Sequence, residues 1–170
     1  MTAAPRVLPH LLSALPFAGV IGWLLSACFR TATLGTVALT PATLLQDGLF
    51  WVVGIQGFIT GSGHLVIPGH VARSIGWPES PLQWEVGLAS ISYGVLGVFA
   101  AGFGPDWWLA AIVAFAIFCL GAAAGHVREM VARHNFAPGN AGPMLVFDVV
   151  APLLLAGLYL LARPALSAGV

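Results

Sequence analysis

The sequence predicts an all-α bundle of transmembrane helices, and two features of its composition lead to this fold class. Hydrophobic residues make up 59% of the 170 residues, whereas charged residues make up only 7%. A soluble domain carries about 25% charged residues to keep its surface hydrated, so this chain has too little charge to cover a soluble surface. The hydrophobic residues also form continuous stretches of about 20 residues, the length that an α-helix needs to cross a bilayer.

Five hydrophobic stretches have this length, and we predict one membrane-spanning helix for each. They cover residues 8–29, 44–67, 84–103, 107–131 and 144–162. Inside a bilayer every backbone polar group must be paired within the protein, which restricts spanning segments to helices or closed barrels. Barrel strands show alternating hydrophobicity, whereas these stretches are continuous. We therefore expect residues 1–170 to form a single integral membrane domain embedded in the lipid bilayer.

The first stretch has two interpretations. Arg6, the hydrophobic run and the string Leu25-Ser26-Ala27-Cys28 are typical of a lipoprotein signal peptide. Cleavage there would leave a lipidated Cys28 and only four spans. The run is long and is interrupted by Pro16, so we favour an uncleaved helix and five spans.

The connections between the later stretches differ in length and predict the orientation. A short turn, Gly104-Pro105-Asp106, joins the third and fourth stretches and suits a helix start. Two longer polar segments, residues 68–83 and 133–143, lie on the same side as the N-terminus if there are five spans. Cytoplasmic segments of membrane proteins carry an excess of Lys and Arg. The N-terminal side holds Arg6, Arg73, Arg128 and Arg133, against Arg30 and Arg163 on the other, so we place the N-terminus in the cytoplasm.

The charge distribution argues against nucleic-acid binding. The chain has six positive and six negative side chains and a formal net charge of zero. Binding to phosphates needs clustered cations, and the sequence contains no lysine and no basic run. Cys28 and Cys119 both lie in hydrophobic runs and are expected to be small apolar residues rather than a disulfide or redox pair.

Small and amide residues inside the stretches indicate helix contacts. Gly57-x-x-x-Gly61 lies in the second stretch and Gly121-x-x-x-Gly125 in the fourth. Such pairs let helix backbones approach closely in lipid. We expect packing within one bundle, and the alternative is contact with a second copy or with a membrane-complex partner. Because each motif leads to a histidine-bearing helix end, close approach of the two helices would bring His64 and His126 together. Gln56, in mid-membrane, is expected to form an interhelical hydrogen bond.

Five ionisable residues from four different stretches are expected near one membrane face. They are His64, Glu85, His126, Glu129 and Asp148. Ionisable groups within or beside hydrocarbon are costly, so such residues are functional-site candidates. His126 and Glu129 are three residues apart and therefore share one face of a helix.

Several interpretations of this group remain open from the sequence. The residues resemble a carboxylate-bridged divalent metal site, or a zinc site made by His64, His126 and a carboxylate. His64 and His126 are also candidate axial ligands of a haem. The structural alternative is a buried network in which Glu85 or Asp148 pairs with Arg128 or Arg73 and the histidines bond to carbonyls.

Some strings resemble a known family. They are Gly63-His64, residues 71–78, residues 80–87, Gly125-His126 and residues 135–142. They look like those of an uncharacterised family of small bacterial multi-helix membrane proteins, a domain of unknown function, over residues 44–162. The chain is also faintly similar to DoxX-like four-helix membrane proteins. The resemblance implies a multi-helix protein of the bacterial inner membrane and no particular activity.

Together these observations predict an inner-membrane protein whose polar cluster is structural or binds a small ligand or partner. One alternative is a metal-dependent membrane oxidoreductase or hydrolase that uses His64, Glu85, His126 and Glu129. The other is a small proton-coupled transporter. The sequence identifies no catalytic residue and leaves open whether the protein is an enzyme.

Overall fold

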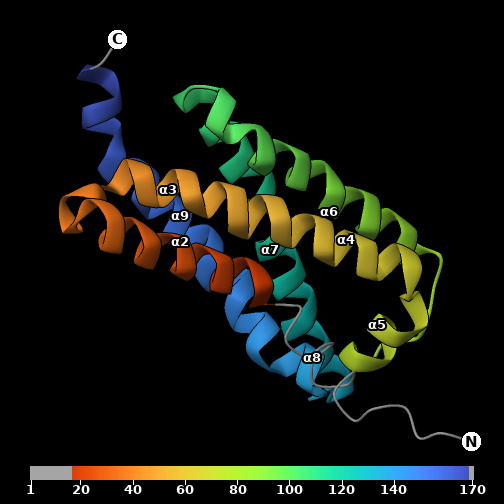
Figure 1. Cartoon of the computed structure of the whole chain (residues 1–170). Helices are drawn as coiled ribbons and strands as arrows, with labels where there is room; N and C mark the ends of the chain where they lie inside the picture. Colours follow the sequence, from red (N-terminus) through yellow and green to blue (C-terminus); the bar gives the residue numbers. More distant parts are fainter. Residues whose placement is uncertain (1–16, 169–170) are drawn as a thin grey trace, which may run out of the picture.

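The computed structural model describes residues 17–168, with side chains as far as Pro164, and this part of the chain contains helices and no strand (Figure 1). Four helical segments are long and apolar enough to cross a membrane: Pro41–Val66, Leu82–Gly102, Pro105–Arg133 and Pro138–Pro164. A shorter apolar helix, Ala18–Leu34, precedes them. These segments confirm the predicted helical membrane class. The part of the first predicted stretch from Leu8 to Pro16 lies outside the described residues.

The elements follow one another with short connections. In chain order they are α2 (Ala18–Leu34), η2 (Thr36–Ala38), α3 (Pro41–Gly48), η3 (Leu49–Ile55), α4 (Gln56–Val66), α5 (Pro68–Ile75), α6 (Leu82–Phe99), η4 (Ala100–Gly102), α7 (Pro105–Arg133), α8 (Pro138–Ala141) and α9 (Pro143–Ala168). α3, η3 and α4 form one continuous rod, in which η3 is a π-helical stretch (Figure 1). The two predicted polar segments contain the short helices α5 and α8.

Proline and threonine residues explain where several helices begin. Proline occupies the first position of α3, α5, α7, α8 and α9, where its missing N–H costs no hydrogen bond. Thr40 caps α3, because its hydroxyl accepts from the Thr43 N–H and the Thr43 hydroxyl accepts from the Thr40 N–H. The predicted turn before α7 is present, with Pro105 at the helix start and Asp106 in the first turn.

The long rod packs most closely on α6, through glycines on both helices. A Cβ on Gly97 would lie 2.4 Å from the Gly54 nitrogen and 2.5 Å from the Leu49 carbonyl oxygen. A Cβ on Gly57 would lie 2.8 Å from the Gly94 Cα. Backbone-to-backbone contact of this kind is open only to glycine, as is common in membrane bundles.

The two Gly-x-x-x-Gly motifs do not meet, so they do not bring His64 and His126 together. Gly57 and Gly61 contact α6, whereas a Cβ on Gly121 would have no neighbouring atom within 4 Å. A Cβ on Gly125 would only reach the Trp77 ring, at 3.8 Å. The rod pairs with α6, the next long helix in the chain, and this pairing occupies its glycine face.

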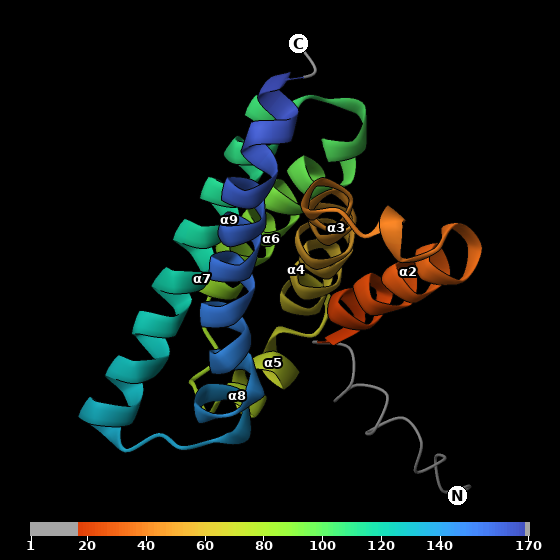
Figure 2. The ribbon, with the colours of Figure 1, turned by 90° about the vertical axis from the view of Figure 1, so that its left-hand side faces the viewer.

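α2 runs along α3 and η3, and α7 lies beside α9 (Figure 2). The Gly19 N–H donates to Gln56 Oε1 at 2.9 Å, which confirms the predicted interhelical bond of Gln56. Farther along, the Trp23 Nε1–H donates to the Leu44 carbonyl at 2.9 Å. α2 is continuous through Leu25–Cys28.

The interior is apolar and the outside is apolar as well. Leu45, Leu49, Phe115 and Leu155 are buried in the core. Many large apolar side chains on the outside are exposed, among them Ile117 at 71%. A soluble protein would hide most of this surface, whereas a bilayer covers it with hydrocarbon, so the surface fits embedding in lipid.

Candidate functional site

The polar residues of interest lie where α5 and α8 close one end of the bundle (Figure 1). Four of them form a group: half-buried Trp77 after α5 and the buried residues His126 near the end of α7, Asn140 in α8 and Asp148 in the second turn of α9. We call this group the Asn140 cluster. It joins the loop after α5 to the three helices α7, α8 and α9.

Asn140 is the centre of the cluster and is fully buried. Its Oδ1 accepts from the Trp77 Nε1–H at 3.1 Å and lies 2.8 Å from His126 Nδ1. Its Nδ2 donates to the His126 carbonyl at 3.2 Å and to the Asn135 carbonyl at 2.9 Å. One amide therefore uses both its donors and both acceptor positions to hold three segments together.

This bonding pattern assigns a hydrogen to Nδ1 of the His126 ring. Indole nitrogen is only a donor, so the atom of Asn140 that faces Trp77 must be the amide oxygen. The same oxygen faces His126 Nδ1, which must therefore carry a hydrogen. His126 Nε2 is left to face Asp148 Oδ2, at 3.6 Å. The Trp77 and His126 rings lie beside each other, with centroids 5.7 Å apart.

Asp148 lies at the inner edge of the cluster. Its side chain and that of His126 are each 9% exposed. A buried carboxylate needs a partner, and His126 supplies one from the neighbouring helix α7. The pair holds α7 against α9 at this end.

A second set of contacts locks the loop after α7 onto the end of α5. The Asn135 Nδ2–H donates to the Ile75 carbonyl at 3.0 Å and to the Gly76 carbonyl at 3.3 Å. Gly76 ends α5 in the left-handed conformation, with φ of 74°, which glycine adopts without strain. A Cβ on Gly139 would lie 2.5 Å from the Ser74 carbonyl oxygen, so the loops touch through their backbones.

His64 belongs to a different contact. Its Nδ1 hydrogen-bonds to Gln83 Oε1, which links the end of α4 to the start of α6. Gln83 is buried, whereas His64 is half-buried. This pairing follows from the close packing of the rod on α6, because the same contact that joins their glycines brings the ends of these helices together.

The structure thus separates the five predicted site residues. His126 and Asp148 approach each other, and His64 lies on Gln83. Glu85 is exposed, and Glu129 Oε2 lies 3.6 Å from Arg133 Nη1, one helical turn away. Within residues 17–164, no three His, Cys, Asp or Glu side chains are grouped so that they could hold a metal ion. The network also differs from the expected one: Asp148 pairs with His126 rather than an arginine, and the histidines bond to side-chain amides.

Residues 10–167 match the Family of unknown function (DUF6790). The chain belongs to this family. The chain matches no curated protein and no solved structure. DUF6790 membership confirms the resemblance to an uncharacterised family, while the similarity to DoxX-like proteins stays a prediction.

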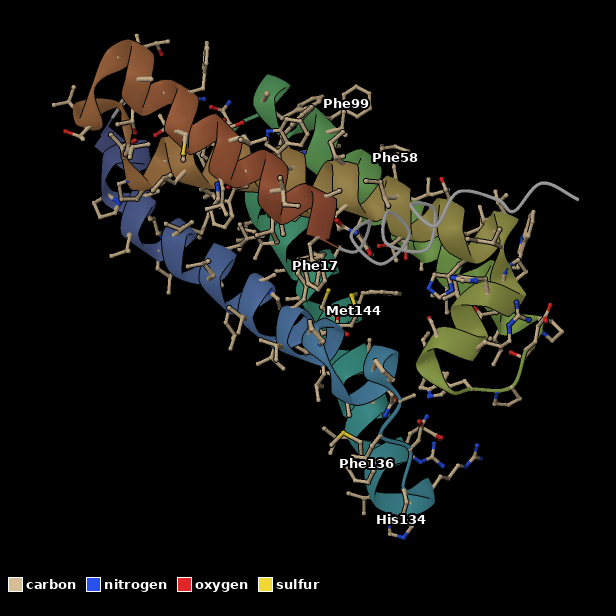
Figure 3. All side chains as sticks on the ribbon, turned by 60° about the horizontal axis from the view of Figure 1, so that its bottom comes forward. Phe17, Phe58, Phe99, His134, Phe136 and Met144 are labelled. Carbon is tan, nitrogen blue, oxygen red and sulfur yellow. The ribbon has the colours of Figure 1, made fainter. Side chains whose placement is uncertain are left out.

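Four residues that make these contacts were not proposed as site residues from the sequence: Trp77, Gln83, Asn135 and Asn140. Neutral amides and indoles carry no charge, so the search for ionisable residues did not select them. Their positions inside the strings that resemble the family were the available signal. Other loop residues point outward: His134 and Phe136 lie at the tip beyond α7, and both are exposed (Figure 3).

Substitutions of Glu85 and Asp148 test which of these two carboxylates stabilises this DUF6790 member. Glu85→Gln should change the free energy of unfolding by no more than about 0.5 kcal/mol, because the side chain is exposed. Asp148→Ala should cost about 3 kcal/mol, because it removes the partner of buried His126 and leaves a void. Thermal unfolding in detergent measures both. A larger loss in Glu85→Gln than in Asp148→Ala would contradict this assignment.

Proposed function

We propose that this protein is a non-enzymatic protein of the bacterial inner membrane in which the Asn140 cluster is a structural clasp. The clasp holds the loop after α5, the helix α8 and the ends of α7 and α9 in one arrangement. The loops then present a fixed surface at the membrane face, to which a small ligand or a protein partner binds.

The observation that carries the proposal is the complete use of the Asn140 amide. Asn140 makes four bonds to three segments while being fully buried. Among the described side chains, no buried nitrogen or oxygen lacks a hydrogen-bond partner. Fully satisfied polar networks rigidify a structure, and the low dielectric of the interior makes any missing bond costly. Both features are expected of a clasp.

The arginine distribution supports a cytoplasmic position for the clasp. Arg73, Arg128 and Arg133 belong to elements at this end, whereas Arg30 and Arg163 lie towards the other end. Arg6, in the N-terminal sequence, adds to the clasp side if the chain has five spans. The excess of positive charge on cytoplasmic segments then places the N-terminus in the cytoplasm.

The metal-dependent alternative has less support. A catalytic zinc takes three protein ligands and keeps one position open for water or substrate. Of the candidate set, His126 and Asp148 alone approach each other, and the remaining ligands would have to move from other contacts. One observation favours the proton-coupled transporter. It is the buried His126–Asp148 pair, since such pairs relay protons in membrane carriers.

Metal removal tests the clasp against the metal site. The detergent-purified protein is treated with a strong chelator, its metal content is measured, and its thermal unfolding is compared with that of the untreated protein. A clasp of side chains needs no ion, so we expect a melting temperature unchanged to within about 1 °C. A large fall that stoichiometric zinc, iron, manganese or copper restores would overturn the proposal.

A further inference from the structure

A second polar feature lies at the other end of the bundle, near the α2–α3 connection. The Arg30 Nε–H donates to Asp47 Oδ2 at 2.6 Å, and the Arg30 Nη2–H donates to Asp47 Oδ1 at 2.8 Å. The side chains are 30% and 15% exposed, so the pair is only partly covered. The Asn140 cluster contains neither residue.

The ion pair lies in the wall of an open cavity between α2 and the start of the rod. The cavity has a volume of about 450 Å³, within the usual range for small-ligand sites. Leu25, Phe29 and Trp51 provide apolar wall, and Ser26 lies beside them. The Ser26 hydroxyl accepts from the Trp51 Nε1–H at 2.7 Å, so this part of the wall is already bonded.

The polar and apolar parts of the cavity are ordered along the helix axis. Arg30 lies about 12 Å from Gly22 along α2, from the rise of 1.5 Å per residue. Gly22 lines the inner end, against the Trp51 ring, while Thr33 and Leu34 line the end near the connection. The charged pair is therefore near the outer end of the bundle and the apolar wall lies deeper. A phospholipid in a bilayer has the same arrangement, with its polar headgroup at the membrane surface and its acyl chains deeper in the hydrocarbon.

We propose that this cavity binds a phospholipid with an amine headgroup, of the phosphatidylethanolamine class. The phosphate lies against the Arg30 guanidinium, whose Nη1 is not part of the pair with Asp47, and the ammonium lies against the Asp47 carboxylate. An acyl chain extends along Leu25 and Phe29, which are 63% and 70% exposed.

Charge complementarity selects this occupant. The pair is neutral overall, but it presents one positive and one negative group side by side. A zwitterionic headgroup carries the complementary charges, a negative phosphate and a positive ammonium. An anionic lipid would place uncompensated charge beside Asp47. A choline headgroup carries no N–H donor, so it cannot hydrogen-bond to the carboxylate. Charge-assisted hydrogen bonds are about twice as strong as neutral ones, so this difference should be measurable.

The test is native mass spectrometry of the full chain in detergent, incubated with an equimolar mixture of phosphatidylethanolamine, phosphatidylcholine and phosphatidylglycerol. The wild type should retain phosphatidylethanolamine about tenfold over either competitor, as expected for lost charge-assisted bonds. Asp47→Asn makes the site cationic and should shift the preference to phosphatidylglycerol. Equal retention of the three lipids by the wild type would overturn the proposal, as would an unchanged preference in Asp47→Asn.

A second pair of variants leaves the ion pair intact and controls for misfolding. Leu25→Trp fills the apolar wall from an exposed position and should reduce retained phosphatidylethanolamine about tenfold by occupying the space of the chain. Leu24→Trp is the matched control, because Leu24 is 60% exposed and does not line the cavity. Equal lipid retention by both tryptophan variants would contradict the assigned cavity. This test is independent of the clasp at the other end.

Discussion

Asn140→Ala should lower the free energy of unfolding by about 4 kcal/mol, because it removes the hub of the clasp. The variant leaves the Trp77 Nε1–H and the His126 Nδ1–H without their acceptor, and it leaves two backbone carbonyls without their donor. Each buried group left without a partner costs about 1–3 kcal/mol, and the sum is reduced by whatever water enters. Thermal unfolding in detergent should show a fall of about 10 °C.

Gln46→Ala is the matched control for this experiment. Gln46 also carries an amide on a helix and is half-buried, but it lies in α3, away from the two loops. It should change the melting temperature by no more than about 2 °C. If Asn140→Ala melted with the wild type, the cluster would not be a structural clasp. Limited proteolysis should also cut Asn140→Ala first within residues 76–81 or 134–142, since those loops lose their common anchor.

Gly97→Ala should destabilise the bundle by about 3 kcal/mol despite the better helix propensity of alanine. The added Cβ would lie 2.4 Å from the Gly54 nitrogen and 2.5 Å from the Leu49 carbonyl oxygen. Both atoms are backbone, so no side chain can rotate away, and α6 must move from η3. Helix packing in lipid depends on such close contact, because no hydrophobic effect drives apolar helices together there.

Gly121→Ala is the opposite case in the same kind of motif. A Cβ on Gly121 would have no neighbour within 4 Å, so the substitution should be neutral or stabilise the helix by up to about 1 kcal/mol. Both variants are compared with the wild type by thermal unfolding in detergent at several protein concentrations. A loss of stability in Gly121→Ala that depends on protein concentration would instead reveal a contact between copies, which is the alternative that the sequence left open.

The sequence was informative about the helices because their signals are local. A long hydrophobic run, a proline at the first turn and a capping threonine act within a few residues, so they identify the span of Pro105–Arg133 and the start of α3 without knowledge of the rest. The Gly57 motif was correctly interpreted as a packing surface. The sequence did not identify its partner, because glycine spacing shows that a helix has a close contact and does not show with which helix.

The candidate site was only partly predictable for a related reason. The sequence selected His126 and Asp148, which the structure brings to 3.6 Å, because buried ionisable residues are rare and conspicuous. It also selected Glu85, which is exposed on α6. A shift of one position along a helix can decide whether a side chain is buried or exposed, since neighbouring positions differ by about 100° around the axis. Asn140 was not selected, because an uncharged amide gives no sign of making several buried hydrogen bonds.

By itself the sequence determined that this protein is a bundle of apolar helices. Composition, run length and the need to pair every backbone group in hydrocarbon fix that outcome whatever the helices touch. Only the tertiary structure decided which polar residues meet. The rod packs on α6 through backbone contact at glycines, and this packing brings His64 to Gln83. α8 packs against α7, and this contact brings Asn140 to His126. Those partners depend on how helices pack, and packing is a property of the whole chain.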